Sequence, residues 1–180
     1  QLKDLNADIQ VIVAFRMLPQ SVWAMPHLGS VNVHGSLLPH YRGAAPINRA
    51  IMNGEKVTGI TTFFLKHEID TGDILFYEQV PIDPTDNAGT LHDKLMQTGA
   101  QVLLKTMAAI LNDNYTEIPQ NNLLKPGETI KTAPKIFKED CRINWNRPWN
   151  EIINHIRGLS PYPAAFTELF KDENEPLGMK

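Results

Sequence analysis

Residues 31–46 read Val-Asn-Val-His-Gly-Ser-Leu-Leu-Pro-His-Tyr-Arg-Gly-Ala-Ala-Pro, and this stretch decides the fold. It begins as a short apolar strand in which Asn32 and His34 share one face, because side chains alternate along a strand. A loop containing glycine and proline follows, and a helix is predicted to begin near Ala45. Buried inside a sheet, the polar pair would need hydrogen-bond partners. At the carboxyl end of a strand, it opens onto the crevice in which α/β proteins bind ligands.

Strands and helices alternate on both sides of this stretch. The nearly continuous apolar run 8–15 predicts a buried parallel strand, joined to the strand at 29–34 by a short helix at 19–24. This arrangement predicts an α/β fold with a Rossmann-like open sheet, and further strands are expected upstream. The other predicted elements are strands at 58–65, 74–82, 143–145 and 164–170, and helices at 45–52, 90–111 and 148–157.

Three connections matter for the site. The polar loop 66–73 joins its two flanking strands into an antiparallel pair. Asn87 and Thr90 supply start signals for the long amphipathic helix that follows. Residues 112–132 are polar and rich in asparagine, which predicts a linker or an extended surface strap.

The composition is that of an ordinary globular protein. Hydrophobic residues make up 42% of the 180 residues and charged residues 21%, which fits neither a disordered nor a membrane class. No apolar run approaches the ~18 residues that a spanning helix needs. The net charge of −3 gives no overall nucleic-acid footprint, although a local basic patch would still allow an RNA partner. The start lacks Met and a signal peptide, so we expect a piece of a longer protein, truncated at both ends.

The cysteine content limits the available chemistry. Cys141 is the single cysteine, so the chain can form neither an internal disulfide nor a cysteine-based zinc site. No other ligand cluster has zinc spacing, and we therefore expect no metal. A reduced, cytoplasmic protein is the simple expectation, and a monomer is favoured although the sequence is silent on oligomeric state.

Three polar residues are predicted at the ends of strands: Asn32, His34 and Asp70. They suit acyl-type transfer to an amine. An imidazole can take the proton that the attacking amine loses, and a carboxylate can orient the ring and stabilise its charged form. An amide NH₂ group can stabilise the developing oxyanion. The substrate's own amine is the nucleophile, so the site needs no serine or cysteine.

Each of these residues also has a structural interpretation. Asn32 could satisfy loop backbone groups, His34 could be a packed histidine, and Asp70 could belong to an Asx turn. Ser36 follows His34 by two residues and raises the possibility of a Ser–His hydrolase. The Gly-x-Ser-x-Gly setting of such enzymes is absent, which weighs against that alternative.

Two motifs resemble the signature of the folate-dependent formyltransferase superfamily. They are Asn-Val-His-Gly-Ser-Leu-Leu-Pro at 32–39 and Ile-Asp-Thr-Gly at 69–72. The resemblance implies that the Asn, His and Asp are catalytic and that 10-formyltetrahydrofolate is the formyl donor. It implies folate contacts from Ser36, Leu37, Leu38 and Pro39. It also implies a pterin pocket lined by Phe15, Met17 and Leu18, with residues 67–72 forming its other wall.

Further segments resemble the branch of the superfamily that formylates the methionine of initiator tRNA. They are residues 42–47, 133–140, 143–145 and 156–163. This resemblance implies a catalytic domain at 1–112, a linker at 113–138 and the start of an OB-like β-barrel domain at 139–180. It implies initiator methionyl-tRNA as the partner, with Arg42 near its acceptor end. A surface salt bridge is an equally good interpretation of Arg42.

Three other functions share parts of this pattern. An amino-sugar-nucleotide formyltransferase would use the same three residues and the same cofactor, but the segment Lys-Ile-Phe-Lys-Glu-Asp at 135–140 argues against it. A non-catalytic folate- or RNA-binding fragment would keep only the binding surfaces. A hydrolase would release formate from the folate without an amine acceptor.

Overall fold

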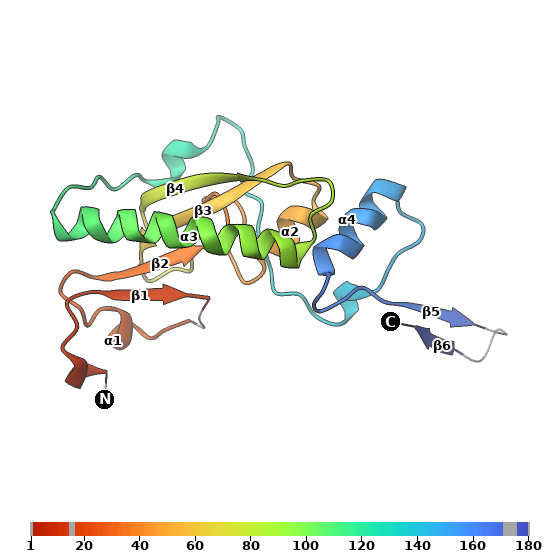
Figure 1. The fold of residues 1–180 in the computed structure, drawn as a ribbon, viewed down its shortest axis with the longest axis horizontal. Coiled ribbons are helices and arrows are strands. Elements are labelled where there is room, and N and C mark those ends of the chain that lie inside the picture. The colour runs from red at the N-terminus through yellow and green to blue at the C-terminus, as the bar shows by residue number, and fades with distance from the viewer. Residues whose placement is uncertain (1, 15–16, 171–175, 180) are drawn as a thin grey trace.

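The computed structural model describes residues 2–14, 17–170 and 176–179. Its centre is a four-stranded mixed sheet in the order β1-β2-β3-β4 (Figure 1). The strands are β1 Gln10–Val13, β2 Ser30–His34, β3 Val57–Phe64 and β4 Ile74–Pro81. β1 and β2 pair in parallel, whereas the other two pairs are antiparallel. This sheet confirms the predicted α/β class and the predicted hairpin around the 66–73 loop.

The helices and the last strands also follow the sequence order closely. The helices are α1 Gln20–Trp23, α2 Pro46–Met52, α3 Ala88–Leu111 and α4 Trp149–Leu159. Three short 3₁₀ turns are η1 Lys3–Leu5, η2 Gln120–Leu123 and η3 Glu139–Cys141. The chain ends in a hairpin of β5 Thr167–Phe170 and β6 Pro176–Met179. The described residues reach no further into the expected β-barrel.

The long helix α3 covers one face of the sheet and contacts both β3 and β4 (Figure 1). It begins two residues before the predicted start, because the Asn87 side chain accepts from the Thr90 backbone N–H and the Thr90 hydroxyl accepts from the Asn87 backbone N–H. Its inward stripe of Leu91, Leu95 and Val102 is buried in the main core. Each buried leucine of this kind stabilises the fold by roughly 1.5–3 kcal/mol.

The prediction of a buried strand at 8–15 is wrong in one respect. β1 is parallel to β2, as expected, but Val11 and Val13 are 39% and 60% exposed. β1 has only β2 as a neighbour in the described sheet. It is therefore an edge strand of that sheet, whereas a buried strand was expected.

The predicted strand at 143–145 is also wrong. Among the described residues, the chain here forms an isolated β-bridge between Arg142 and Phe166 instead of a strand. The Asn144 side-chain oxygen then accepts from the Asn146 N–H, and this local bond turns the chain away.

Residues 112–134, which we call the strap, leave the end of α3 and return across the sheet (Figure 1). The strap pairs with the domain at Ile74–Ile118 and at Arg42–Thr132. It is extended, as predicted, but it is not only a surface segment because Gln120 and Ala133 are buried.

Candidate functional site

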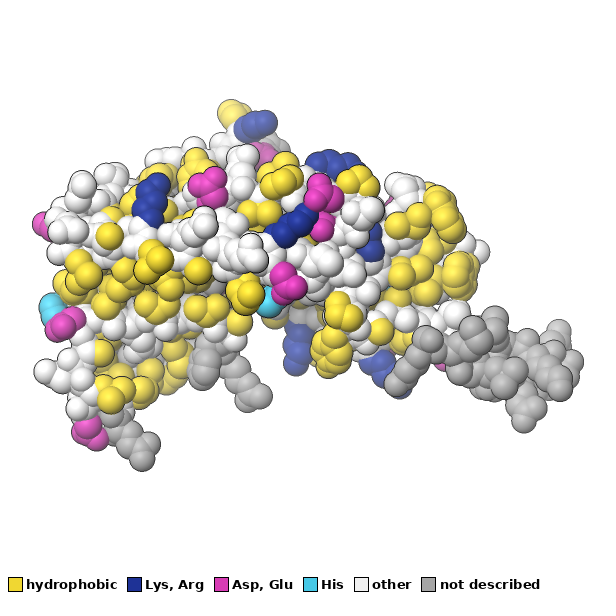
Figure 2. Space-filling view, viewed as in Figure 1, with side chains coloured by type: hydrophobic (Ala, Val, Ile, Leu, Met, Phe, Trp, Pro, Cys, Tyr) yellow, Lys and Arg dark blue, Asp and Glu magenta, His cyan; other side chains and the backbone are white. Residues whose placement is uncertain are grey.

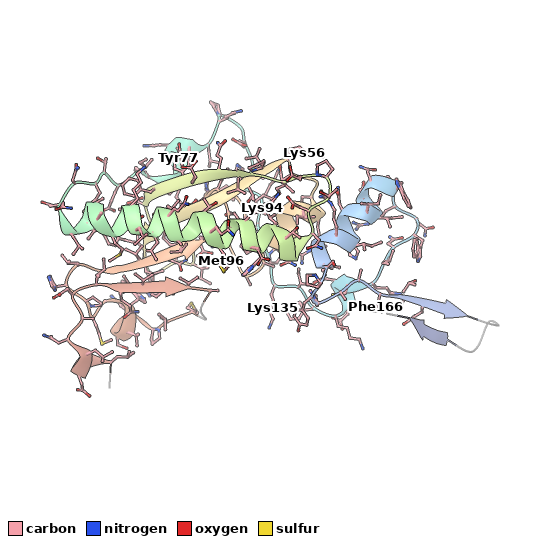
Figure 3. The ribbon with its side chains drawn as sticks, in the orientation of Figure 1. Lys56, Tyr77, Lys94, Met96, Lys135 and Phe166 are labelled. Carbon is pink, nitrogen blue, oxygen red and sulfur yellow. The ribbon has the colours of Figure 1, made fainter. Side chains whose placement is uncertain are left out.

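A cavity of about 1050 Å³ opens where β1 and β2 end. Its wall includes the three residues that the sequence singled out, Asn32, His34 and Asp70. One flank of α3 adds apolar side chains that include Leu95, Met96 and Leu103. Hydrophobic atoms gather along this flank in Figure 2, and Figure 3 shows Met96 on the side of α3 that faces β2.

The His34 ring is held in one orientation. It is 6% exposed, and its Nε2 lies 2.8 Å from the backbone oxygen of Tyr41. A carbonyl oxygen can only accept, so the ring donates through Nε2 and the neutral ring leaves Nδ1 unprotonated. Nδ1 lies 3.8 Å from Asp70 Oδ2. The nitrogen that can receive a proton is therefore the one that faces the carboxylate.

The position of Asp70 depends on backbone contacts from other segments. Its Oδ2 accepts from the Gly43 N–H at 2.9 Å. Its backbone oxygen accepts from Gln120 Nε2 at 2.8 Å. The residue has a φ of 54°, a left-handed conformation that asparagine and aspartate tolerate better than most residues.

The Asn32 side chain faces the cavity from the middle of β2, beside Ile12 of β1 and Phe63 of β3. Within residues 2–14, 17–170 and 176–179, its carboxamide makes no hydrogen bond. The structural interpretation of Asn32 as a loop-satisfying amide therefore does not hold among the described residues. Its NH₂ group is free to donate to a ligand.

The loop that orients His34 is held in place by hydrogen bonds of the Tyr41 side chain. The Tyr41 hydroxyl donates to Glu55 at 2.6 Å, and Lys131 of the strap donates to the same carboxylate. Burial raises the pKa of Tyr41, and the bond to Glu55 raises it further. Burial alone would raise the pKa of Glu55, but the hydrogen bonds from Lys131 and Tyr41 outweigh it and lower that pKa.

The residues expected at folate fall into two groups. Met17, Leu18 and residues 67–70 line the cavity, as the predicted pterin walls would. Phe15 lies outside the described residues.

Residues 36–39 do not line the cavity. They pack inside the protein and support the loop that follows β2. Leu38 and Pro39 are buried, and half-buried Leu37 packs beside Gly59. Ser36 is fully buried and its hydroxyl donates to the His40 backbone oxygen at 2.7 Å. Ser36 therefore has neither the exposure nor the histidine partner that a hydrolase nucleophile needs.

Arg42 lies outside the cavity wall. Its Nε and Nη2 donate to Gln120 Oε1 at 3.0 and 2.6 Å. Arg42 therefore binds a neutral amide on the strap, and the alternative interpretation of a surface salt bridge does not hold.

Sequence reasoning missed several residues of the site. The apolar flank of α3 has a visible signal in the periodicity that predicts the helix, but periodicity alone does not assign those residues to a site. Gln120 had no signal, since a glutamine in a polar segment does not stand out.

The described residues contain no group of three or more His, Cys, Asp or Glu side chains placed to hold a metal ion. In the same part of the chain, no helix is long and apolar enough to cross a membrane.

Asn32 and His34 of β2 and Asp70 of the 66–73 loop thus line one cavity at the open α/β sheet. Residues 1–107 match the formyl transferase family, and residues 135–177 match the C-terminal domain of formyl transferases. The chain belongs to the formyl transferase family.

Its relatives point to one branch of that family. It is 56% identical over 179 residues to a protein of Bacteroides thetaiotaomicron named methionyl-tRNA formyltransferase, covering 99% of this chain and 55% of the relative. A protein of the same name from Flavobacterium johnsoniae is 53% identical over 181 residues, covering 100% and 56%. The chain thus spans about half the length of these relatives.

Solved structures share the fold at low identity. A 4-N formyltransferase from Francisella tularensis has a TM-score of 0.78 and 22% identity, covering 99% of this chain and 72% of that one. HypX from Aquifex aeolicus, solved in complex with tetrahydrofolic acid, has a TM-score of 0.74 and 20% identity, covering 90% and 27%. These likenesses support the fold alone.

Proposed function

We propose that the protein transfers the formyl group of 10-formyltetrahydrofolate to the α-amine of methionine on initiator tRNA. The observation that carries this proposal is the convergence of Asn32, His34 and Asp70 on one cavity, in a chain whose relatives bear that name. The reaction belongs to the full-length protein, of which this chain is about half by the measure of its relatives.

The proton balance of the reaction fits the geometry at His34. The amine nitrogen bonds to the formyl carbon, and the bond from that carbon to folate N10 breaks. The amine gives up one proton and N10 gains one, so a single group can carry the proton between them. His34 Nδ1 is unprotonated in the neutral ring, and it faces Asp70 at 3.8 Å. Asp70 stabilises the imidazolium while the ring holds the proton.

Asn32 has the second task. Negative charge develops on the formyl oxygen as the amine attacks, and a prealigned NH₂ donor stabilises that charge. One such donor is worth roughly 2.7–4 kcal/mol in the best-studied case. The carboxamide faces the cavity without a protein hydrogen bond among the described residues, so it needs no rearrangement to serve.

The cavity suits a bulky, partly apolar donor. Its volume of about 1050 Å³ lies just above the ~300–1,000 Å³ range of small-molecule sites. Met17, Leu18 and residues 67–70 are the groups that we assign to the pterin. Residues 36–39 would affect folate binding indirectly, because they pack behind the residues that form the cavity wall.

For the acceptor we assign Arg42 as a contact to the tRNA end. Two of its donor nitrogens bind Gln120, which leaves Nη1 to meet a phosphate or ribose group. We place the enzyme in the cytoplasm, where translation begins, and propose that it acts as a monomer.

The test is a formyl-transfer assay on the full-length protein with 10-formyltetrahydrofolate. Methionyl initiator tRNA, an amino-sugar nucleotide and no acceptor are compared in parallel. We expect formylmethionyl-tRNA as the main product. Formylation of the sugar amine alone would establish the sugar enzyme instead, and formate released without an acceptor would establish a hydrolase. If no formyl transfer occurred in any of the three reactions, a non-catalytic folate- or RNA-binding module would be the remaining function.

A further inference from the structure

We infer that Gln120, on the strap, is a positioning residue that fixes Asp70 in place against His34. This inference rests on the proposed function of the same site. It assigns the strap a part in catalysis in addition to its role as a connection between domains.

The Gln120 carboxamide uses its whole hydrogen-bonding capacity inside the protein. Its Oε1 accepts from Arg42 Nε and Nη2 at 3.0 and 2.6 Å. Its Nε2 donates to the backbone oxygens of Asp70 and Gly72 at 2.8 and 2.7 Å. The side chain is buried, with the residue 3% exposed. Arginine cannot accept and a carbonyl cannot donate, so only one orientation of the amide satisfies all four bonds.

The two donated bonds hold both sides of the turn that carries Asp70. The turn holds Asp70 in a left-handed conformation with a φ of 54°, and the bonds from Gln120 fix two backbone oxygens of this turn. At Gly72 a Cβ atom would lie 1.8 Å from the Phe64 oxygen, so the turn lies tightly against β3. Gln120 supplies the contacts that keep the Asp70 backbone in this place.

The strap also holds the loop that orients His34. The Tyr41 N–H donates to the Lys131 oxygen at 2.6 Å, and the Ala133 N–H donates to the Arg42 oxygen at 2.8 Å. The Tyr41 oxygen is the group that fixes His34 Nε2. The strap therefore contacts the supports of both the imidazole and the carboxylate, and Gln120 joins them through Arg42.

The first test compares Gln120→Met with Asn122→Met in the full-length protein. Methionine matches glutamine in length and removes all four bonds, whereas Asn122 is an exposed residue of the same 3₁₀ turn. We expect Gln120→Met to lower kcat by about 10- to 100-fold, the effect of a misplaced catalytic group. The KM for 10-formyltetrahydrofolate should rise by a smaller factor than kcat falls, since Gln120 itself does not line the cavity. Asn122→Met should retain full activity.

A second variant guards against a simple loss of folding. Gln120→Glu keeps the acceptor for Arg42 but turns a carboxylate oxygen toward the two backbone oxygens, so the turn should move while the Arg42 contact stays. We expect a similar fall in kcat in a protein that still unfolds cooperatively above the assay temperature, because the charge pair with Arg42 offsets part of the loss of the two donated bonds.

A double-mutant comparison then separates positioning from general support. If Gln120 acts through Asp70, adding Gln120→Glu to Asp70→Asn should lower the single-turnover rate by less than about threefold. Full activity of either Gln120 variant, or a loss that appears only in KM, would overturn the inference. Failure of the wild type to formylate any acceptor would instead overturn the proposed function.

Discussion

At the scale of the residue, the site depends on hydrogen bonds that leave particular atoms free. His34 donates through Nε2 to the Tyr41 oxygen, so Nδ1 is the ring nitrogen left unprotonated in the neutral form. Asn32 keeps its amide free among the described residues, whereas Ser36 uses its hydroxyl on His40. The roles that we propose follow from these differences.

Replacing Asn32 or His34 by alanine should remove catalysis and spare binding. We expect kcat to fall by roughly 10²–10³-fold for Asn32→Ala and by roughly 10²–10⁴-fold for His34→Ala. Folate affinity, measured by fluorescence titration, should stay within about threefold because other residues form most of the cavity wall. Near-normal turnover in either variant would show that the assigned role is wrong.

Glu55 makes stability depend on pH. Its pKa in the folded protein is lower than the ordinary value of 4.5, despite the opposing effect of burial, because Lys131 and Tyr41 donate to it. Its stabilising effect is therefore present above about pH 4.5 and is lost as the pH falls through the lower folded pKa. Melting curves should show a wild-type advantage over Glu55→Gln at pH 7 that shrinks below pH 4.5. An advantage that is independent of pH would contradict this assignment.

At the scale of the element, α3 is the main support of the cavity. It packs on β3 and β4 through its buried stripe, and Leu95 of that stripe lines the cavity together with Met96 and Leu103. Its start is fixed by the Asn87 cap and by Asp86, which accepts hydrogen bonds from the Thr90 hydroxyl and Lys94.

Asn87→Ala should destabilise the protein through α3 alone. Loss of an N-cap costs about 1 kcal/mol, which corresponds to about 2–4 °C in Tm for a protein of this size. Asn121→Ala is the matched control, because Asn121 is exposed on the strap and caps no α-helix. Equal melting temperatures for the two variants would contradict the importance of the cap.

At the scale of the whole molecule, the C-terminal segment packs on the catalytic part. α4 lies against α2, where the Asn48 amide donates to the Gly158 oxygen at 2.7 Å. Arg157 donates to the backbone oxygens of Asp83, Pro84 and Asp86 just before α3. The packing also buries Ile152 and Leu159 of α4, and Gly158 lies directly against Met52 of α2.

Gly158→Ala should weaken this packing. A Cβ atom at residue 158 would lie 2.6 Å from Met52 Cγ and 3.1 Å from two backbone atoms, so α4 must shift. We expect faster limited proteolysis between α3 and α4 and a KM for methionyl-tRNA raised several-fold, with the KM for folate unchanged. Asn150→Ala, at an exposed position on the same helix, serves as the control. An unchanged proteolysis rate would show that the packing does not depend on this glycine.

The sequence alone determined what local rules control. Apolar periodicity predicted α3 and the hairpin of β3 and β4, and turn residues marked the loops around Asn32, His34 and Asp70. Those signals suffice because each depends on residues a few positions apart. The prediction of a strand at 143–145 was wrong because a local interaction opposed it: the Asn144 side chain accepts a hydrogen bond from the Asn146 backbone.

Only the tertiary structure decided which atoms of the site are free and which are occupied. The tautomer of His34 depends on a carbonyl seven residues away, and the place of Asp70 depends on Gln120, fifty residues further along the chain. The burial of Ser36, Leu38 and Pro39 and the exposure of β1 likewise depend on what packs against them. A sequence shows which groups are available, whereas burial and hydrogen bonding depend on contacts between distant segments that exist only after folding.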